Sequence, residues 1–268
     1  MLKPVFSSSK GRNRLSAVLR KAGDLITIED VSTALSMQRA DASKLLARWN
    51  AQGWIKRLRR GYYAPVPLAS LGQQQVLEDP WVMVPQLFGP ACIGGWSAAE
   101  HWGLTEQLFR STCVLTARKV RQKELTVQGL PFSLKHVKES VLFGTRPVWR
   151  GRARVLVTTP AKTIIDMLDD PAIGGGIRHV ADCLRAYLAN AESKPGELIS
   201  LAEKLGNGAV FKRLGYLAER EGKQDVLVAA CRARLSKGNA KLDPDLPCRK
   251  LVKRWKLWIP ASFAEKRQ

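Results

Sequence analysis

The residues best suited to chemistry in this sequence are polar side chains that fall on one side of a helical stretch, from Arg39 to Gln52. They are Arg39, Ser43, Lys44 and Arg48. The other side of this stretch is apolar and is expected to face a core. Its residues are Ala42, Leu45, Leu46 and Trp49. Because arginine and lysine donate hydrogen bonds to guanine edges and phosphates, the polar side is predicted to enter the major groove of DNA.

A cationic hairpin is predicted directly after this helix. Gly53 tolerates positive φ and is expected to end the helix. The segments Trp54 to Leu58 and Gly61 to Ala64 then alternate like two strands around a tight turn. Arg59 and Arg60 make the turn of this hairpin cationic. Such a loop can lie along a phosphate backbone or enter a minor groove.

Two further helices are expected to position these groups. Thr27 followed by Asp30 is a capping signal for a short helix that runs to about Leu35. An upstream helix is predicted from Arg12 to Ala22, where apolar residues recur at helical spacing. This order of elements is that of a winged helix-turn-helix. A merely solvated basic surface is the alternative, but the helix order, the glycine and the cationic turn together favour DNA binding.

Charge is distributed in separate blocks along the chain. The 268 residues carry 44 Lys and Arg against 23 Asp and Glu, a net charge of +21, which favours a polyanionic partner. Residues 1–70 have a net charge of +9, residues 71–109 of −4 and residues 110–154 of +9. Residues 155–227 are close to neutral at −1, and residues 228–268 return to +8. The neutral block is the one expected to pack against protein, and the last basic block is a further candidate for nucleic-acid binding.

Length and composition indicate two globular parts. The PVPLASLGQQQ segment at 65–75 is typical of an interdomain connection, so we predict a winged-helix domain at 1–72 and a larger domain at 73–268. No apolar run approaches the length needed to cross a bilayer, and MLKPVFSSSK lacks the apolar core of a signal peptide. Five widely spaced cysteines indicate neither a disulfide framework nor a metal site. A cytoplasmic protein with no membrane partner is therefore expected.

The larger domain is predicted to be α+β. Short segments rich in β-formers indicate a small antiparallel sheet within 73–158. They are Ala91 to Trp96, Thr112 to Thr116, Leu125 to Val127, Phe132 to Val137 and Val155 to Thr158. A short helix is expected over Trp81 to Phe88, and a second one opened by a capping box of Ser97 and Glu100. Residues 159–268 are predicted to be mostly helical, with a final strand around Trp255 and Leu257.

The sequence offers little that indicates catalysis. His101, His136 and His179 share no metal-ligand spacing. The glycine run at 174–176 precedes a helix and could bind an anion, but a flexible connection is the simpler interpretation. Glu221-Gly222-Lys223, with Asp166 as an earlier carboxylate, leaves a metal-dependent nuclease as a minor alternative. We therefore expect no enzyme activity, no catalytic residues, no metal and no cofactor.

Several motifs, in order along the chain, resemble the AbiEi-type antitoxins of bacterial abortive-infection (type IV) toxin–antitoxin systems. They are LRRGYYAP, GGWSAAEHWGL at 94–104, TPAKTIIDMLDDP at 159–171, GGIRHVADCL at 175–184, FKRLGYLAE at 211–219 and LPCRKLVKRWKLWIP. The RLGYLAE helix, between a TP…D helix and a terminal RW strand, is the most specific of these matches. The winged helix alone is shared by many regulators.

The resemblance implies a two-part protein that is not an enzyme. The winged helix would bind inverted repeats in the double-stranded promoter of its own operon and repress it, and the C-terminal domain would antagonise a cognate nucleotidyltransferase toxin in phage defence. The resemblance places the DNA contacts on the recognition helix and the wing, at Arg39, Ser43, Lys44, Arg48, Arg57, Arg59 and Arg60. The family signature falls on Arg213, Leu214, Gly215, Tyr216, Glu219 and Trp255. Of these, Leu214 is expected in the core together with Leu217, Gly215 in a close helix contact, and Arg213 in an ion pair with Glu219.

The residues alone, without the resemblance, indicate a DNA-binding module joined to a larger basic domain. A stand-alone, ligand-responsive transcription regulator is the second interpretation. It would need an apolar sensor pocket, and the basic character of residues 228–268 disfavours small apolar effectors.

Overall fold

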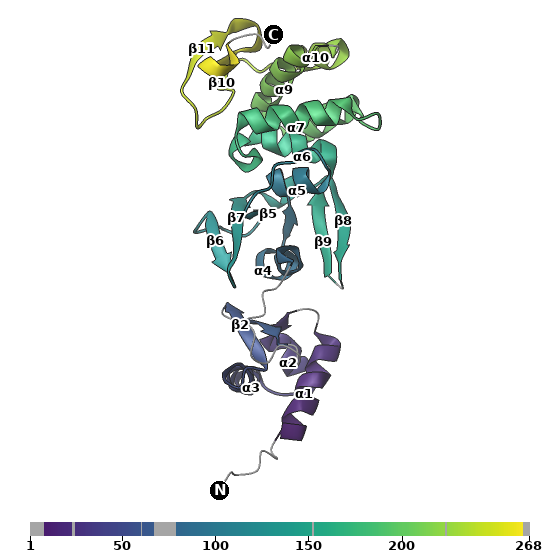
Figure 1. Ribbon diagram of the computed structural model, residues 1–268, viewed down its shortest axis with the longest axis vertical. Helices are drawn as coiled ribbons and strands as arrows, with labels where there is room; N and C mark the ends of the chain where they lie inside the picture. The colour runs from purple at the N-terminus through teal and green to yellow at the C-terminus, as the bar shows by residue number, and fades with distance from the viewer. Residues whose placement is uncertain are drawn as a thin grey trace.

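The computed structural model describes residues 8–22, 25–59, 61–66, 79–151, 153–222 and 224–264. The winged-helix unit comes first along the chain and lies at one end of the molecule (Figure 1). Its elements are α1 (Ser8–Lys21), β1 (Ile26–Thr27), α2 (Ile28–Leu35), α3 (Arg39–Ala51), β2 (Ile55–Arg59) and β3 (Tyr62–Pro65). The three strands form an antiparallel sheet in the order β1-β3-β2. Helix, strand, two helices and a hairpin are the elements of a winged helix-turn-helix.

Local signals explain most of this unit. The Thr27 hydroxyl accepts a hydrogen bond from the Asp30 amide at 3.2 Å, and the Asp30 carboxylate accepts one from the Thr27 amide at 2.8 Å, so the predicted capping box is confirmed. Gly53 has a φ of 72°, as expected for the residue that ends a helix. Strand β1 was not predicted, because two residues are too few to show an alternating pattern.

A six-stranded sheet forms the middle of the molecule. Its strands are β4 (Ala91–Ile93), β5 (Thr112–Thr116), β6 (Glu124–Val127), β7 (Leu130–His136), β8 (Thr145–Arg150) and β9 (Ala153–Thr158). The order is β6-β7-β5-β4-β9-β8, and the pairs β5·β7 and β4·β9 are parallel. The sheet is therefore larger than expected and mixed instead of antiparallel. Strand β8 was not predicted, because Arg146 and Pro147 interrupt its β pattern.

Two short helices flank this sheet. A 3₁₀ turn at Pro80–Met83 leads into α4 (Val84–Phe88), and α5 spans Gly95–His101. The expected capping box at Ser97 and Glu100 is wrong, because α5 begins two residues earlier, with Gly94 as its N-cap. Ser97 is buried inside the helix, and its hydroxyl accepts a hydrogen bond from the Cys113 amide of β5 at 2.9 Å. The serine therefore joins helix to sheet.

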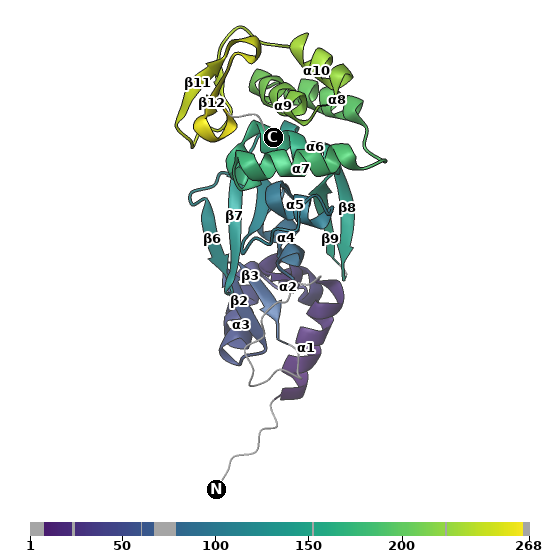
Figure 2. The ribbon, with the colours of Figure 1, turned by 45° about the horizontal axis from the view of Figure 1, so that its top comes forward.

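The helix-rich part predicted for residues 159–268 is confirmed. Its helices are α6 (Pro160–Asp169), α7 (Ile177–Ala189), α8 (Pro195–Leu205), α9 (Gly208–Glu221) and α10 (Asp225–Arg232). The final strand is also confirmed, and it belongs to a three-stranded sheet in the order β10-β12-β11. These strands are β10 (Ala240–Lys241), β11 (Cys248–Val252) and β12 (Leu257–Pro260). They lie beside α9 at the end of the molecule opposite the winged helix (Figures 1 and 2).

The hydrophobic cores follow this arrangement, with one exception. One core holds the winged helix together, one fills α6 to α10 and the terminal strands, and two cover the faces of the large sheet. Leu25 and Ala64, however, pack in the same cluster as Met83, Val84 and other residues of the large sheet and its helices. The winged helix therefore contacts the rest of the chain.

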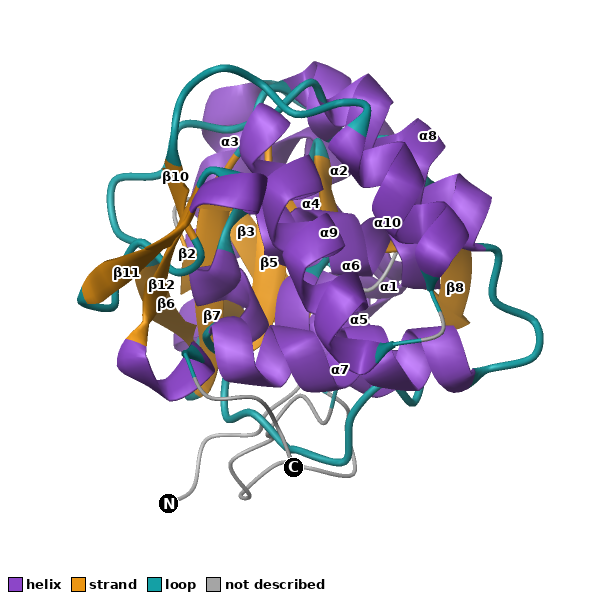
Figure 3. Ribbon diagram, turned by 90° about the horizontal axis from the view of Figure 1, so that it is seen from above, coloured by secondary structure: helices purple, strands orange, loops and turns teal. Residues whose placement is uncertain are grey.

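Figure 3 shows the molecule from above, with helices α7 to α10 crowded over the strands. No helix in the described part of the chain is long and apolar enough to cross a membrane. The segment at 67–75, predicted as an interdomain connection, lies outside the described residues.

Candidate nucleic-acid interface

Helix α3 separates its apolar and polar side chains as the sequence indicates. Ala42, Leu46 and Trp49 are at most 1% exposed and belong to the core of the winged helix. The four residues predicted to contact DNA, Arg39, Ser43, Lys44 and Arg48, are all exposed. The helix thus turns a row of donors toward solvent from a rigid base, as the reading of base edges requires.

Several hydrogen bonds fix α3 relative to its neighbours. The Ser32 hydroxyl of α2 donates to the Met37 carbonyl oxygen at 2.6 Å, which holds the turn between the two helices. At the other end, the Asn50 carboxamide oxygen accepts a hydrogen bond from the Arg57 amide of β2 at 2.8 Å. The hairpin is therefore held in a fixed position beside α3. Asn50 was not singled out from the sequence, since an asparagine near a helix end is too common to be a signal.

Two of the four exposed residues on α3 have acidic partners within the protein. Arg39 pairs with Glu29 of α2, and Lys44 lies 3.7 Å from Asp41 one turn earlier. The side chains of both pairs, Arg39 with Glu29 and Lys44 with Asp41, are more than half exposed. Exposed pairs of this kind stabilise a fold by about 0–1 kcal/mol, so phosphates can compete for both cations.

The hairpin places its basic residues next to α3. Arg57 is exposed in β2, and a register shift between Arg57 and Arg59 bends the strand toward the turn. Arg60 and the side chain of Arg59 lie outside the described residues, although the backbone of Arg59 belongs to β2. On the other side of the turn, Tyr62 packs against the core of the large sheet, together with Leu58. The base of the turn is therefore held by the second part of the chain.

Most residues of the antitoxin-like motifs singled out on α9 lie inside the protein. Arg213 of α9 is 4% exposed, and its guanidinium donates to three carbonyl oxygens. The acceptors are Lys241 at 2.9 Å, Leu168 at 2.6 Å and Asp169 at 2.9 Å. Burial lowers the pKa of Arg213 below its ordinary value. This side chain therefore joins α6, α9 and β10, and it has no surface from which to bind a partner.

Glu219 forms a second network at the other end of α9, and this network lies partly at the surface. One of its oxygens accepts from Arg232 at 2.7 Å, and the other accepts from the Trp255 indole at 2.8 Å and from Arg254. Partial burial raises the pKa of Glu219, but hydrogen bonds from Arg254 and Trp255 outweigh this effect and leave the pKa below its ordinary value. The expected ion pair between Arg213 and Glu219 is therefore wrong, because each residue satisfies different groups.

The other signature residues are packing residues. Leu214 and Leu217 are at most 2% exposed, as predicted. A Cβ atom at Gly215 would lie 2.2 Å from the ring of Trp255, so the expected close contact at this glycine is confirmed. The Tyr216 hydroxyl donates to the Phe263 carbonyl oxygen at 2.7 Å. Together these contacts hold the terminal strands on α9.

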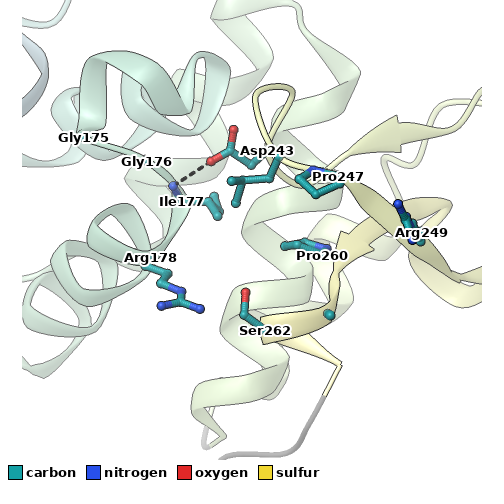
Figure 4. A pocket seen from close by; sticks show the side chains of 11 residues that line it. Gly175, Gly176, Ile177, Arg178, Asp243, Pro247, Arg249, Pro260 and Ser262 are labelled. Carbon is teal, nitrogen blue, oxygen red and sulfur yellow. Dashed lines mark hydrogen bonds between the residues drawn. The ribbon is translucent and has the colours of Figure 1, made fainter.

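The glycine run at 174–176 forms a turn, and the amide that follows it is bound by a carboxylate of the protein itself. Gly175 and Gly176 have φ values of 73° and 95°, which place the Ile177 amide at the start of α7. This amide donates to the Asp243 carboxylate at 3.0 Å (Figure 4). The neighbouring pocket has a volume of about 620 Å³ and is lined mainly by apolar atoms and by Arg178 and Arg249 at its sides. An internal carboxylate therefore occupies the position at which an external anion was considered.

The carboxylates considered for a nuclease have structural partners. Asp166 is buried and pairs with Lys162, also buried, one turn earlier in α6. Burial raises the pKa of Asp166 to about 6, although Lys162 opposes this effect. Glu221 pairs with Arg185 at 2.6 Å, whereas Lys223 lies outside the described residues. Among the described residues, no three His, Cys, Asp or Glu side chains are grouped so as to hold a metal ion.

Two of the three histidines are held by hydrogen bonds or ring contacts inside the protein, and the third is exposed. His179 is hydrogen-bonded to the Gly174 carbonyl oxygen at 2.6 Å and to the Thr105 hydroxyl at 2.8 Å. His101 packs between Trp81 and Trp102. His136 is exposed, and its ring contacts the Arg118 carbonyl oxygen at 3.0 Å.

No family model matches the chain. No curated protein matches it either. Function must therefore be inferred from the residues and their geometry.

Proposed function

We propose that this protein is a DNA-binding repressor of its own operon that also antagonises a nucleotidyltransferase toxin. The first half of this proposal is supported by one observation above all. Helix α3 exposes Arg39, Ser43, Lys44 and Arg48 on the side opposite its buried face, and Asn50 holds the basic hairpin beside it. Palindromic promoter repeats would be read by two copies of this unit.

The toxin-directed half rests on the order of the antitoxin-like motifs along the chain. The signature residues build the joint between α9 and the terminal strands, so they would support a toxin-binding surface without forming it. Direct contact and indirect antagonism both fit this arrangement. A stand-alone transcription regulator is the second candidate, and it differs in having no effect on a toxin.

DNA binding is tested with the full chain and promoter DNA in a mobility-shift assay. Changing Arg39 and Lys44 to Ala should reduce discrimination between operator and unrelated DNA, by roughly 1–3 kcal/mol for each lost base contact. Changing Arg57, Arg59 and Arg60 to Ala should weaken binding to both DNAs and flatten the salt dependence by about one unit per lost phosphate contact. Arg234→Ala, an exposed arginine beyond α10, is the matched control. Equal operator affinity in all variants would refute the assignment.

Toxin antagonism is tested in cells by co-expression with the proposed partner, a cognate nucleotidyltransferase toxin. Wild type should restore growth. The Arg39→Ala/Lys44→Ala variant should restore growth equally, because its changes are confined to α3. Loss of protection in that variant would tie protection to DNA binding, and absence of protection by wild type would favour the stand-alone regulator.

A further inference from the structure

The terminal sheet of β10, β11 and β12 has one face on the core and one outer face, and the outer face carries Trp258, which is not part of a hydrophobic core. In β12, Leu257 and Ile259 are 0% and 2% exposed and pack in the core that contains α9. Side chains alternate between the faces of a strand, so Trp258 lies on the opposite face. Trp258 is partly exposed and belongs to none of the hydrophobic cores.

Strand pairing defines the neighbours of this tryptophan. Lys241 of β10 and Leu251 of β11 both pair in direct register with Trp258. Directly paired residues share a face of the sheet, and neighbouring strands lie about 4.8 Å apart. The indole is therefore flanked by a cation on one side and an apolar side chain on the other.

More cations surround this face. They are Lys241, Arg249 and Lys253, all exposed and without an ion pair within the described part of the chain. Lys250 is also exposed, but it pairs in register with Ile259 and so belongs to the other face. Arg254, by contrast, is held by Glu219. Of the two acidic residues between β10 and β11, Asp243 is buried as the cap of α7, and Asp245 is exposed. The positive charge of the block at 228–268 is thus largely uncompensated at this sheet.

We propose that the outer face of β10, β11 and β12 binds a single-stranded polynucleotide. A base would stack on the indole of Trp258, and Lys241 and Arg249 would bind the phosphates on either side. Aromatic rings that alternate with cations on a sheet are suited to this ligand, because every base has a π face and every linkage is an anion. A duplex is excluded from the stacking contact, since its bases already stack on each other.

This surface is independent of the DNA-reading helix. The terminal sheet and α3 lie at opposite ends of the molecule (Figure 1). The two sites would therefore bind different forms of nucleic acid, a duplex at α3 and a single strand at Trp258.

The full chain is tested by fluorescence anisotropy with a labelled 12-nucleotide oligouridylate, with oligodeoxythymidylate, and with a duplex of the same length. Both single strands should bind, and a preference for one of them identifies RNA or DNA as the ligand. Trp258→Ala should weaken their binding about 5- to 100-fold, the range for loss of one stacked base, and leave duplex binding unchanged. Trp258→Phe keeps an aromatic face and should retain most of the affinity.

Two further variants locate the site. Trp149→Ala is the matched control, because Trp149 is 66% exposed on β8 of the other sheet. Lys241→Glu/Arg249→Glu should lower single-strand affinity and flatten its salt dependence, whereas Arg39→Ala/Lys44→Ala should leave it unchanged. Single-strand binding that survives Trp258→Ala, or that is lost only with Trp149→Ala, overturns the proposal. Neither outcome affects the operator-binding assay.

Discussion

Helices α3 and α9 have similar lengths and comparable numbers of basic residues, but they use these residues in opposite ways. In α3 the basic side chains are exposed, and only Ala42, Leu46 and Trp49 are buried. In α9 every residue from Val210 to Ala218 is buried, including Lys212 and Arg213. A basic residue in a helix is therefore not evidence of a binding surface until its surroundings are known.

The difference follows from what lies around each helix. Helix α3 packs on one side only, against α2 and the hairpin, so its charges can remain hydrated. Helix α9 is enclosed by α6, α8, α10 and the terminal strands, so its charges need internal partners. Carbonyl oxygens at the end of α6 and in β10 supply those partners for Arg213.

The largest effect is expected from removing Arg213. The Arg213→Ala change leaves three buried carbonyl oxygens without this donor, at about 1–3 kcal/mol for each buried group left unsatisfied. We expect the free energy of unfolding to fall by about 4 kcal/mol in urea denaturation. Arg48→Ala on α3 is the matched control and should change it by less than about 0.5 kcal/mol. Similar losses in both variants would remove the distinction between the two helices.

The buried carboxyl of Asp166 should make stability depend on pH. Its pKa is about 6 in the fold, above the ordinary 3.8, because burial disfavours the charged form. A raised pKa means that protonation of this carboxyl stabilises the fold at low pH, and this contribution is lost as pH rises through the window from 3.8 to about 6. The contribution of this protonation to the free energy of unfolding is at most about 3 kcal/mol.

The measurement compares wild type with Asp166→Asn, which keeps an oxygen acceptor for Lys162. Urea denaturation at several values between pH 4 and pH 7 should show wild type losing stability relative to the variant as pH rises. Parallel pH profiles would contradict this expectation.

A smaller loss is expected from a single added methyl group in α9. In Gly215→Ala the new Cβ would lie 2.2 Å from the Trp255 ring and 2.8 Å from the Cβ of Cys231. Overpacking of this kind costs about 1–3 kcal/mol, so the melting temperature should fall. A Cβ at Gly196 in α8 would have no atom within 4 Å, so Gly196→Ala should raise the melting temperature, since alanine favours a helix. Equal melting temperatures for the two variants would argue against the close contact.

The smallest effect concerns the exposed pair of Glu29 and Arg39, on the side of α3 that we propose binds DNA. Glu29→Gln removes the partner that competes with phosphates for Arg39. We expect operator affinity to rise about 2- to 5-fold at low salt, with stability changed by less than about 0.5 kcal/mol. Asp41→Asn, next to Lys44, is a parallel case with a longer separation and should have a weaker effect. A decrease in affinity would show that Glu29 orients Arg39 instead of competing for it.

Local patterns predicted the helices and the hairpin of the winged helix, although α1 begins four residues earlier than predicted and β1 was missed. The capping pair at Thr27 and Asp30, the apolar spacing along α3 and the glycine after it are signals that a short window contains. The exposed positions of Arg39, Ser43, Lys44 and Arg48 follow from the same helical period. Whether they contact DNA is a matter for the binding assays.

Long-range pairing was harder to predict. The parallel contact between β4 and β9 joins residues 64 positions apart, at Ile93 and Val157, and no local pattern specifies it. The same holds for the partners of Arg213, which lie 28 to 45 residues away in the sequence. It also holds for Glu219, whose partners Arg254 and Trp255 lie 35 and 36 residues away. The sequence suggested an ion pair between Arg213 and Glu219 within α9, but Arg213 instead donates to carbonyl oxygens of other segments.

The contacts that join distant segments also set the order in which the protein can fold during synthesis. The core of the winged helix uses residues no later than Tyr63, so it can be complete while the ribosome is still adding the rest of the chain. Helices α7 and α9 must wait for Asp243, which caps the first, and for Trp255, which packs against Gly215 of the second. The nascent chain can therefore complete the core of the winged helix before its larger part has closed, whereas Leu25 and Ala64 must wait for Met83 and Val84.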